Sequence, residues 1–289
     1  MHEFNKDNIR LIALDLDDTI IMHGTDVSPL TLSAIQHVHS QGITVAISTG
    51  RLVRQIPAVL RNSPCIRYII GANGGCIIDK ETQEILSHSY LDKKQVKEIV
   101  QTGKRTNAGI YLNCEGVGYC DLKCLFMTIW FIRRKYSRAQ RKEVSQLYRF
   151  RLLPLFGLKR FLSKLDDPVY KVSCMYRREE IRAAQSDKYK DIKGISYAFV
   201  SGHGLEITAD DATKGIAIGF LCDKMGISKQ EVVAFGDSGN DMSMREYAGT
   251  FVAMGNASSE VKEIADFITG KVAEDGVAMF LNEHWLGTI

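Results

Sequence analysis

The chain has 289 residues, of which 45% are hydrophobic and 25% charged, and its formal net charge is +3. These values are ordinary for a globular protein and exclude one without a buried core, while the length allows one large domain or two smaller ones. No apolar run is long enough for a membrane span or a signal sequence, so we expect a cytoplasmic protein without a membrane partner.

The first third of the chain alternates strand and helix patterns. Short apolar runs typical of buried strands recur, and segments with helical spacing lie between them. Ser28-Pro29 is a helix start and Gly42 a helix stop. In chain order we expect a strand at 11–14, a helix from Pro29 to Gly42, a strand at 43–47, a helix at 52–60, a strand at 66–70 and a glycine-rich turn at 71–75.

The middle of the chain has less regular apolar runs and many basic and aromatic residues. We expect strands at 110–112 and 169–175, and helices at 93–102 and 179–189. We interpret residues 86–203 as an α/β cap domain inserted into a core made of residues 1–85 and 204–289, with a margin of about ten residues at each boundary.

One segment of this insertion is strongly basic. Residues 133–164 hold eleven Lys or Arg residues and one acid, Glu143, for a local net charge of +10, so the rest of the chain carries about −7. The mixture of cations and aromatic rings suits amphipathic helices with a solvated charged face, which we favour, or the attraction of an anionic substrate. Nucleic acid is a less favoured partner that stays open.

The last third returns to the regular alternation. We expect helices at 213–225, 241–247, 257–265 and 275–281, and strands at 232–235, 250–253 and 267–268. Strands that alternate with helices favour an α/β fold with a doubly wound, Rossmann-like parallel sheet covered on both faces.

The seven cysteines favour buried, reduced thiols over a redox or metal site. Their number is odd, and no C-x-x-C pair is present. Cys120 and Cys124 have a C-x-x-x-C spacing that suits a metal, but no second Cys or His pair lies close by.

Polar motifs follow three of the expected strands. Asp15-Leu16-Asp17-Asp18-Thr19 ends the first, Ser48-Thr49-Gly50-Arg51 the second, and Gly236-Asp237-Ser238-Gly239-Asn240-Asp241 the strand at 232–235. Lys214 opens the helix before that last strand. Ligands of doubly wound sheets bind beyond the carboxyl ends of the strands, where the strand order switches, so the motifs predict a single site.

The acids of these motifs predict a divalent cation. Asp15 and Asp17 face one crevice, and Asp237 adds a third carboxylate that would repel the others without a cation. Ligands that are all oxygen atoms favour Mg²⁺. One carboxylate would attack phosphorus and the other would protonate the leaving oxygen. A phosphate would lie against the cation and three protein groups that stabilise a transferring phosphoryl group: Lys214, the Thr49 hydroxyl and the Gly50 amide.

The motifs D-x-D-x-T, T-G-R, Lys and G-D-x-x-N-D, in this order, resemble those of the haloacid-dehalogenase superfamily. More narrowly they resemble its Cof-type phosphatases, the type IIB members with a large α/β cap. The resemblance extends over the whole chain, through the Asn73-Gly74 turn, the Leu205-Glu206-Ile207 run and the ending at 274–278. It implies a Mg²⁺-dependent phosphatase acting on phosphate monoesters of small metabolites, such as sugar phosphates.

The resemblance also implies a role for each site residue. Asp15 would be the nucleophile that forms a phospho-aspartyl intermediate, and Asp17 the general acid and then base. Arg51 would be structural or a weak phosphate ligand, and Ser48 offers a second hydroxyl beside the favoured Thr49. Phosphate or substrate would be bound by Thr49, Gly50, Asn73, Lys214 and Asn240, and the metal by Asp15, Asp17 through its carbonyl, Asp237, Asn240 and Asp241.

Two other functions stay open. A phosphomutase on this scaffold would return the phosphoryl group of Asp15 to a sugar instead of water. A sensor of phosphorylated ligands or an RNA-binding protein would have no need for the pair Asp15 and Asp17. The sequence leaves the physiological substrate, the pathway and the oligomeric state open.

Overall fold

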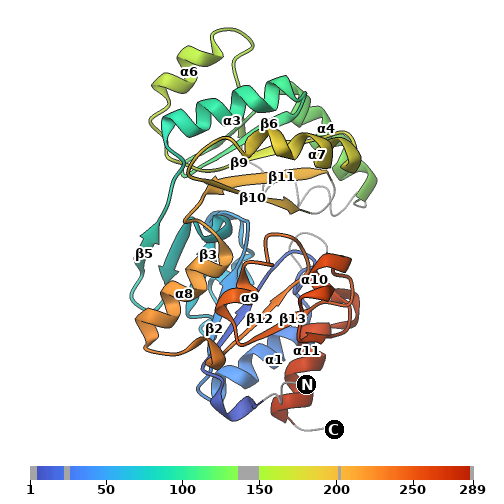
Figure 1. Cartoon of the computed structure of the whole chain (residues 1–289). Helices are drawn as coiled ribbons and strands as arrows, with labels where there is room; N and C mark the ends of the chain where they lie inside the picture. Colours follow the sequence, from blue (N-terminus) through green and yellow to red (C-terminus); the bar gives the residue numbers. More distant parts are fainter. Residues whose placement is uncertain (1–4, 23–26, 136–149, 201–202, 287–289) are drawn as a thin grey trace. The chain divides into compact units, whose positions relative to one another are not determined.

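The computed structural model describes residues 5–22, 27–135, 150–200 and 203–286 (Figure 1). The chain forms two compact units, one made of Met1–His88 with Thr213–Ile289 and the other of Ser89–Ala212. The chain returns to the first unit at Thr213, because β11 (Gly204–Ala209) is a strand of the second unit's sheet.

The first unit is built on an eight-stranded sheet with the order β14-β13-β12-β1-β2-β3-β4-β5. Neighbouring strands from β14 to β3 are parallel, which confirms the doubly wound α/β core. β4 and β5 extend the sheet in antiparallel fashion, an addition that we did not expect. The strands are β1 (Leu11–Leu14), β2 (Thr44–Ser48), β3 (Tyr68–Gly71), β4 (Cys76–Asp79), β5 (Glu84–His88), β12 (Val232–Gly236), β13 (Thr250–Ala253) and β14 (Phe267–Ile268).

The helices of the first unit begin and end largely where the sequence predicts. The Ser28 hydroxyl accepts from the Thr31 amide (2.9 Å) at the start of α1, and Gly42 follows its end with φ +84°. The helices are α1 (Pro29–Ser40), α2 (Ala58–Arg61), α8 (Lys214–Met225), α9 (Met244–Tyr247), α10 (Ser259–Glu263) and α11 (Gly276–Leu281).

The continuous helix expected at 52–60 is wrong. The segment instead forms a 3-10 turn at Val53–Gln55 and the short α2, with Pro57 between them. Pro57 has no N–H to donate and disfavours the helical conformation for Ile56, whose φ and ψ are −73° and 133°. The loop after β2 is therefore irregular at the point where it carries Arg51.

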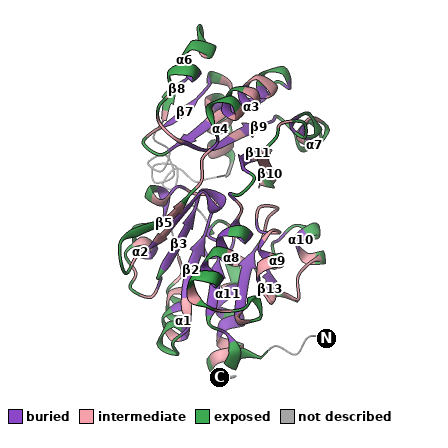
Figure 2. Ribbon diagram, turned by 60° about the vertical axis from the view of Figure 1, so that its left-hand side comes forward, coloured by how far each residue is buried: buried purple, intermediate pink, exposed green. Residues whose placement is uncertain are grey.

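Burial identifies the centre of the first unit. All residues of β1 and β12 are buried, in keeping with their position in the middle of the sheet. Figure 2 shows the same burial, in purple, along the neighbouring strands β2 and β3. The order of the strands along the chain reverses between these two strands. The residues that follow β1 and β12 therefore lie at the switch point of the sheet.

The second unit is a six-stranded sheet with the order β10-β11-β9-β6-β7-β8, antiparallel except for the pair β7 and β8. Ile110, Leu112 and Cys114 alternate along β6 and belong to the unit's apolar core. Its strands are β6 (Gly109–Cys114), β7 (Gly118–Cys120), β8 (Phe150–Leu152), β9 (Val169–Met175), β10 (Ile195–Val200) and β11, and its helices are α3 (Lys93–Arg105), α4 (Leu122–Lys135), α6 (Leu158–Lys164) and α7 (Glu179–Ser186).

The basic segment is described only in part. Residues 136–149, with four of its cations and with Tyr136 and Tyr148, lie outside the described residues. The described cations lie near the end of α4 and on β8 and α6. The Arg134 guanidinium lies 5.2 Å from the centre of the Trp130 ring, and the Phe126, Trp130 and Phe156 side chains are exposed.

The seven cysteines are free thiols, and all except Cys65 are buried. Burial raises the pKa of Cys120 to about 11 and that of Cys124 to about 12, which disfavours the thiolate that a metal or redox site requires. Within the described ranges, no helix has both the length and the apolar composition to cross a membrane.

Candidate active site

Three motifs meet at the carboxyl ends of the central strands. Asp15 directly follows β1, and its amide donates to the Phe235 carbonyl of β12 (3.2 Å). Asp237 directly follows β12, and Asp241 lies four residues further on. Carboxylate oxygens of Asp15, Asp237 and Asp241 lie within 4.8 Å of one another. The sheet thus brings together acids that are more than 200 residues apart in the chain.

Lys214 lies between two of these acids. Its Nζ donates to Asp15 Oδ1 and to Asp241 Oδ1, both at 2.6 Å. The Lys214 side chain is fully buried, and it is placed by the start of α8, where the Thr213 hydroxyl caps the helix by accepting from the Ile216 amide (3.1 Å). One ammonium group therefore serves two buried carboxylates.

Asp241 binds both the Lys214 side chain and the backbone of the loop after β12. Its Oδ2 accepts from the backbone amides of Asp237 and Ser238, each at 3.0 Å. Gly236 permits this close packing, because a Cβ at that position would lie 2.4 Å from Asp241 Cβ. The Asp241 carboxylate, which is fully buried, therefore holds Asp237 beside Asp15.

Burial and mutual repulsion raise the pKa of the acids in this cluster. Desolvation, followed by the negative charge of Asp241, raises the pKa of Asp15 to about 7, against the opposing effect of Lys214. The same two causes, with Asp15 in addition, raise the pKa of Asp237 to about 9. Burial alone would lower the pKa of Lys214, but the charges of Asp15 and Asp241 outweigh it and raise that pKa.

The donor set fits a divalent cation. Three carboxylates and one ammonium leave two negative charges when all the acids are ionised, and their ligand atoms are all oxygen. Desolvation first, and then mutual repulsion, raise the pKa values of Asp15 and Asp237, and the charge of a bound cation would oppose both effects.

The Thr49-Gly50 segment extends the site from the end of β2. Thr49 is fully buried, its amide donates to the Ile70 carbonyl (2.8 Å), and its hydroxyl accepts from the Arg51 amide (3.1 Å). A hydroxyl that accepts one hydrogen bond still has its proton to donate, which is what a phosphate oxygen needs. The Ser48 hydroxyl, also buried, has no hydrogen-bond partner among the described residues.

Asn73 and Asn240 connect the loops around the cluster. The Asn240 side chain donates to Asn73 Oδ1 (3.0 Å) and accepts from the Ser238 hydroxyl (2.6 Å). The Asn73 amide donates to the Thr49 carbonyl (3.0 Å). The two asparagines thus tie the Thr49 loop to the loop after β12.

Asp17 lies at the exposed rim. Its side chain is 54% exposed, and it is not a member of the group formed by Asp15, Asp237 and Asp241 within the part of the chain that the structure describes. Asp18 has a left-handed φ of 57°, a conformation that Gly, Asn and Asp adopt more readily than other residues.

The sequence does not reveal which side chain binds the Asp17 carboxylate. Arg51 donates from Nε to Asp17 Oδ2 (2.8 Å) and from Nη2 to Asp17 Oδ1 (2.5 Å). The T-G-R motif contains this arginine, but its spacing carries no information on which carboxylate the side chain reaches.

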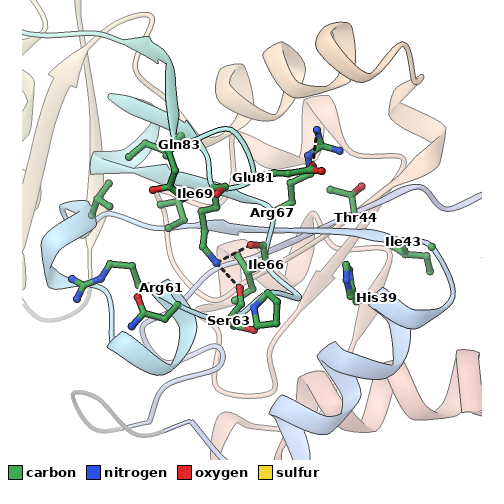
Figure 3. A pocket seen from close by; sticks show the side chains of 16 residues that line it. His39, Ile43, Thr44, Arg61, Ser63, Ile66, Arg67, Ile69, Glu81 and Gln83 are labelled. Carbon is green, nitrogen blue, oxygen red and sulfur yellow. Dashed lines mark hydrogen bonds and ion pairs between the residues drawn. The ribbon is translucent and has the colours of Figure 1, made fainter.

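A cavity of about 920 Å³ lies elsewhere in the first unit (Figure 3). Ile43, Thr44, Ile66 and Arg67 line it and come from the starts of β2 and β3, at the edge of the sheet opposite to Asp15. The Lys80 ammonium, which also lines it, donates to the carbonyls of Ser63 (2.5 Å) and Ile66 (2.9 Å). This cavity contains none of the motif residues.

The fold and the site together define a class of phosphoryl-transfer hydrolases. Its features here are a doubly wound sheet, a D-x-D motif after a central strand, and a buried lysine with further acids at the switch point. A family model described as haloacid dehalogenase-like hydrolase matches residues 12–281, so the chain belongs to that family. This confirms the resemblance to its Cof-type phosphatases, and the chain is a phosphoric monoester hydrolase of this family.

Relatives of similar length carry phosphatase names. A 5-amino-6-(5-phospho-D-ribitylamino)uracil phosphatase of Bacillus subtilis is 29% identical over 95% of this chain and 98% of its own. An HMP-PP phosphatase of Yersinia pseudotuberculosis is 26% identical over 96% of each chain.

Solved structures agree on the fold. A haloacid dehalogenase-like hydrolase from B. subtilis has a TM-score of 0.81 and 27% identity over 96% of this chain and 99% of its own. A subclass IIB sugar phosphatase has a TM-score of 0.75 at 20% identity over 96% of this chain and 100% of its own, a level that indicates the fold alone.

Proposed function

We propose that this phosphatase is Mg²⁺-dependent and hydrolyses phosphate monoesters of small metabolites through a phospho-aspartyl intermediate on Asp15. The observation that carries the proposal is the buried contact of Lys214 with Asp15 and Asp241, beside Asp237, at the switch point of the sheet. A protein that only binds phosphorylated ligands has no need for a nucleophilic carboxylate, whereas phosphoryl transfer needs both a nucleophile and fixed positive charge.

In the first step, an oxygen of the Asp15 carboxylate attacks phosphorus and the bond to the leaving oxygen breaks. Lys214 holds Asp15 Oδ1 and fixes the orientation of the carboxylate. Asp17 gives its proton to the leaving oxygen, so the alcohol departs neutral. The Thr49 hydroxyl and the Gly50 amide bind the phosphoryl oxygens.

In the second step, a water attacks the phosphorus of the aspartyl phosphate. Asp17, now ionised, takes the water proton, and the bond between phosphorus and Asp15 breaks. Phosphate leaves, and both carboxyl groups return to their starting states.

Asp15, the Asp17 carbonyl and Asp237 would hold Mg²⁺, with Asn240 and Asp241 supporting the loop. When bound, the cation supplies positive charge that neutralises the phosphoryl oxygens. The tie from Asn240 to Asn73 makes the two asparagines supports of the site in this proposal.

Phosphate release from a panel of esters tests the proposal. The panel includes sugar, nucleotide, flavin and pyridoxal phosphates and the compounds named for the two relatives, because about 29% identity leaves the substrate open. We expect release that needs Mg²⁺, stops with EDTA and is absent in Asp15→Asn. A well-folded protein that binds Mg²⁺ and releases no phosphate from any ester would contradict the proposal.

A further inference from the structure

Arg51 and Asp17 form a two-point ion pair. The Nε and Nη2 groups of the guanidinium each donate to a different oxygen of the carboxylate, at 2.8 and 2.5 Å. This parallel pairing fixes the plane of the carboxylate as well as its distance, which a single ammonium contact cannot do.

Arg51 is the fixed member of the pair. Its side chain is only 12% exposed, and Nη1 donates to the Gln55 carbonyl (3.1 Å). Its backbone is held as well, since its amide donates to the Thr49 hydroxyl and its carbonyl accepts from the Ala72 amide (2.8 Å). Asp17 is 54% exposed, so Arg51 determines where its carboxylate lies.

The pair contributes little to folding. An ion pair with a carboxylate that is half exposed adds little to stability, because solvent screens it. A carboxylate has about four lone-pair sites, and the arginine fork uses one on each oxygen. Either oxygen of Asp17 therefore keeps a site that points away from Arg51.

We propose that Arg51 is a positioning residue that acts through Asp17. It holds the carboxylate at the rim of the site, next to the Thr49-Gly50 loop, in the place from which Asp17 exchanges a proton with the leaving oxygen. The inference rests on the proposed function, since it assigns a role within that same reaction.

Esters with different leaving groups test the role of Arg51. An alkyl phosphate needs a proton on its leaving oxygen, whereas a nitrophenyl phosphate leaves as a stable anion. We expect Arg51→Gln to lower kcat/KM, which reports the steps up to departure of the leaving group, by about tenfold or more for the alkyl ester and by less than about twofold for the aryl ester. Arg51→Lys, which keeps the charge but not the fork, should fall between wild type and Arg51→Gln.

A matched control and a double-mutant cycle complete the experiment. Arg54→Gln removes an exposed arginine from the adjacent 3-10 turn and should leave both esters unaffected. In Asp17→Asn, adding Arg51→Gln should cause no further loss, because the group through which Arg51 acts is gone.

An equal loss of kcat/KM for both esters would overturn the inference, as would a loss that adds in full to that of Asp17→Asn. A wild-type protein that turns over neither ester would overturn the proposed function and this inference with it. Wild-type activity that Asp15→Asn abolishes, with an Arg51→Gln variant that treats both esters like wild type, would overturn the role of Arg51 alone.

Discussion

Among the single residues of the site, Lys214 provides the positive charge that balances the buried carboxylates. It is fully buried between Asp15 and Asp241, and no other cation contacts these two carboxylates among the hydrogen bonds of the described residues. Removing one member of such a cluster leaves uncompensated charge in a place without water.

Replacing Lys214 by Met should therefore harm both activity and stability. We expect kcat to fall by about 10²-fold or more, since a fixed positive charge beside the phosphoryl group is lost. We expect the free energy of unfolding to fall by about 3–5 kcal/mol. Lys224→Met, on the exposed end of the same helix, is the matched control and should leave both quantities unchanged. A Lys214→Met protein with wild-type kcat would contradict the assignment.

The raised pKa values of Asp15 and Asp237 predict how stability depends on pH. Both values lie above the ordinary 3.8, so the folded protein holds protons that the unfolded chain has lost. Stability gained from these protons is lost as the pH rises through about 7 and then about 9. In EDTA, the thermal midpoint should fall between pH 6 and pH 9, and saturating Mg²⁺ should reduce that fall.

Urea or thermal unfolding over this pH range checks the prediction. Asp237→Asn should remove the decline between about pH 7 and about pH 9 and lessen it below pH 7, because Asp237 holds its proton to about pH 9 whereas Asp15 has lost its own by about pH 7. A midpoint in EDTA that rises from pH 6 to pH 9 would have the wrong sign for two acids with raised pKa values.

Single residues also mark what the sequence can predict about the site. The sequence predicts that three of these residues lie close together: Asp15, Asp237 and Lys214. Each directly follows a strand or opens a helix, and the sheet brings such positions together. The pairing of Arg51 with Asp17 is not predicted, because it depends on the irregular path of the chain between Thr49 and Pro57 and on a long side chain with several rotamers.

Among the structural elements, the turn between β3 and β4 connects the Thr49 loop to the start of α8. Gly74 has φ +102°, and a Cβ there would lie 2.3 Å from the Thr213 carbonyl oxygen, just before Lys214. Gly42, at the end of α1, also has a positive φ of 84°, but a Cβ there would meet no atom of the described residues within 4 Å. A comparison of substitutions at the two glycines therefore distinguishes the cost of a positive φ from the cost of steric overlap.

Alanine at these two positions should have different effects. Gly42→Ala carries the cost of a left-handed residue alone, about 1–2 kcal/mol, and should leave kcat unchanged. Gly74→Ala adds an overlap with backbone that has no room to move, so we expect a loss of about 3 kcal/mol or more and a lower kcat through displaced Lys214. Urea unfolding and steady-state rates measure both effects, and equal losses in the two variants would contradict this account.

The elements themselves were predicted best where packing and local signals agree. The expected strands at 11–14, 232–235 and 250–253 are buried in the parallel sheet, and the helix from Pro29 has its capping serine. The expected helix at 52–60 is interrupted, because Pro57 has no amide hydrogen to donate and disfavours the helical conformation for Ile56. The hairpin of β4 and β5 was missed because β5 is an edge strand whose residues are exposed or half-buried, without a buried apolar run.

Charge is unevenly distributed over the whole molecule. Residues 133–164 carry a net charge of +10 and belong to the second unit, whereas the acids of the candidate site belong to the first. The sequence predicts this asymmetry fully, since it needs only a count of residues. Which ligand the basic segment meets depends on side-chain positions in three dimensions, and counting provides no information on those.

In the reaction proposed for the whole molecule, the phosphoryl group is bound covalently to Asp15 during turnover. Rapid mixing of enzyme and radiolabelled ester with Mg²⁺, followed by an acid quench, measures labelled protein and free phosphate in the same samples. With an aryl ester as the substrate, the Asp17→Asn variant should accumulate labelled protein, because it lacks the base that activates water. We predict labelled protein before phosphate appears, with the label on the peptide that contains Asp15 and none in Asp15→Asn. Steady phosphate release without any labelled protein, in both wild type and Asp17→Asn, would rule out a covalent intermediate on Asp15.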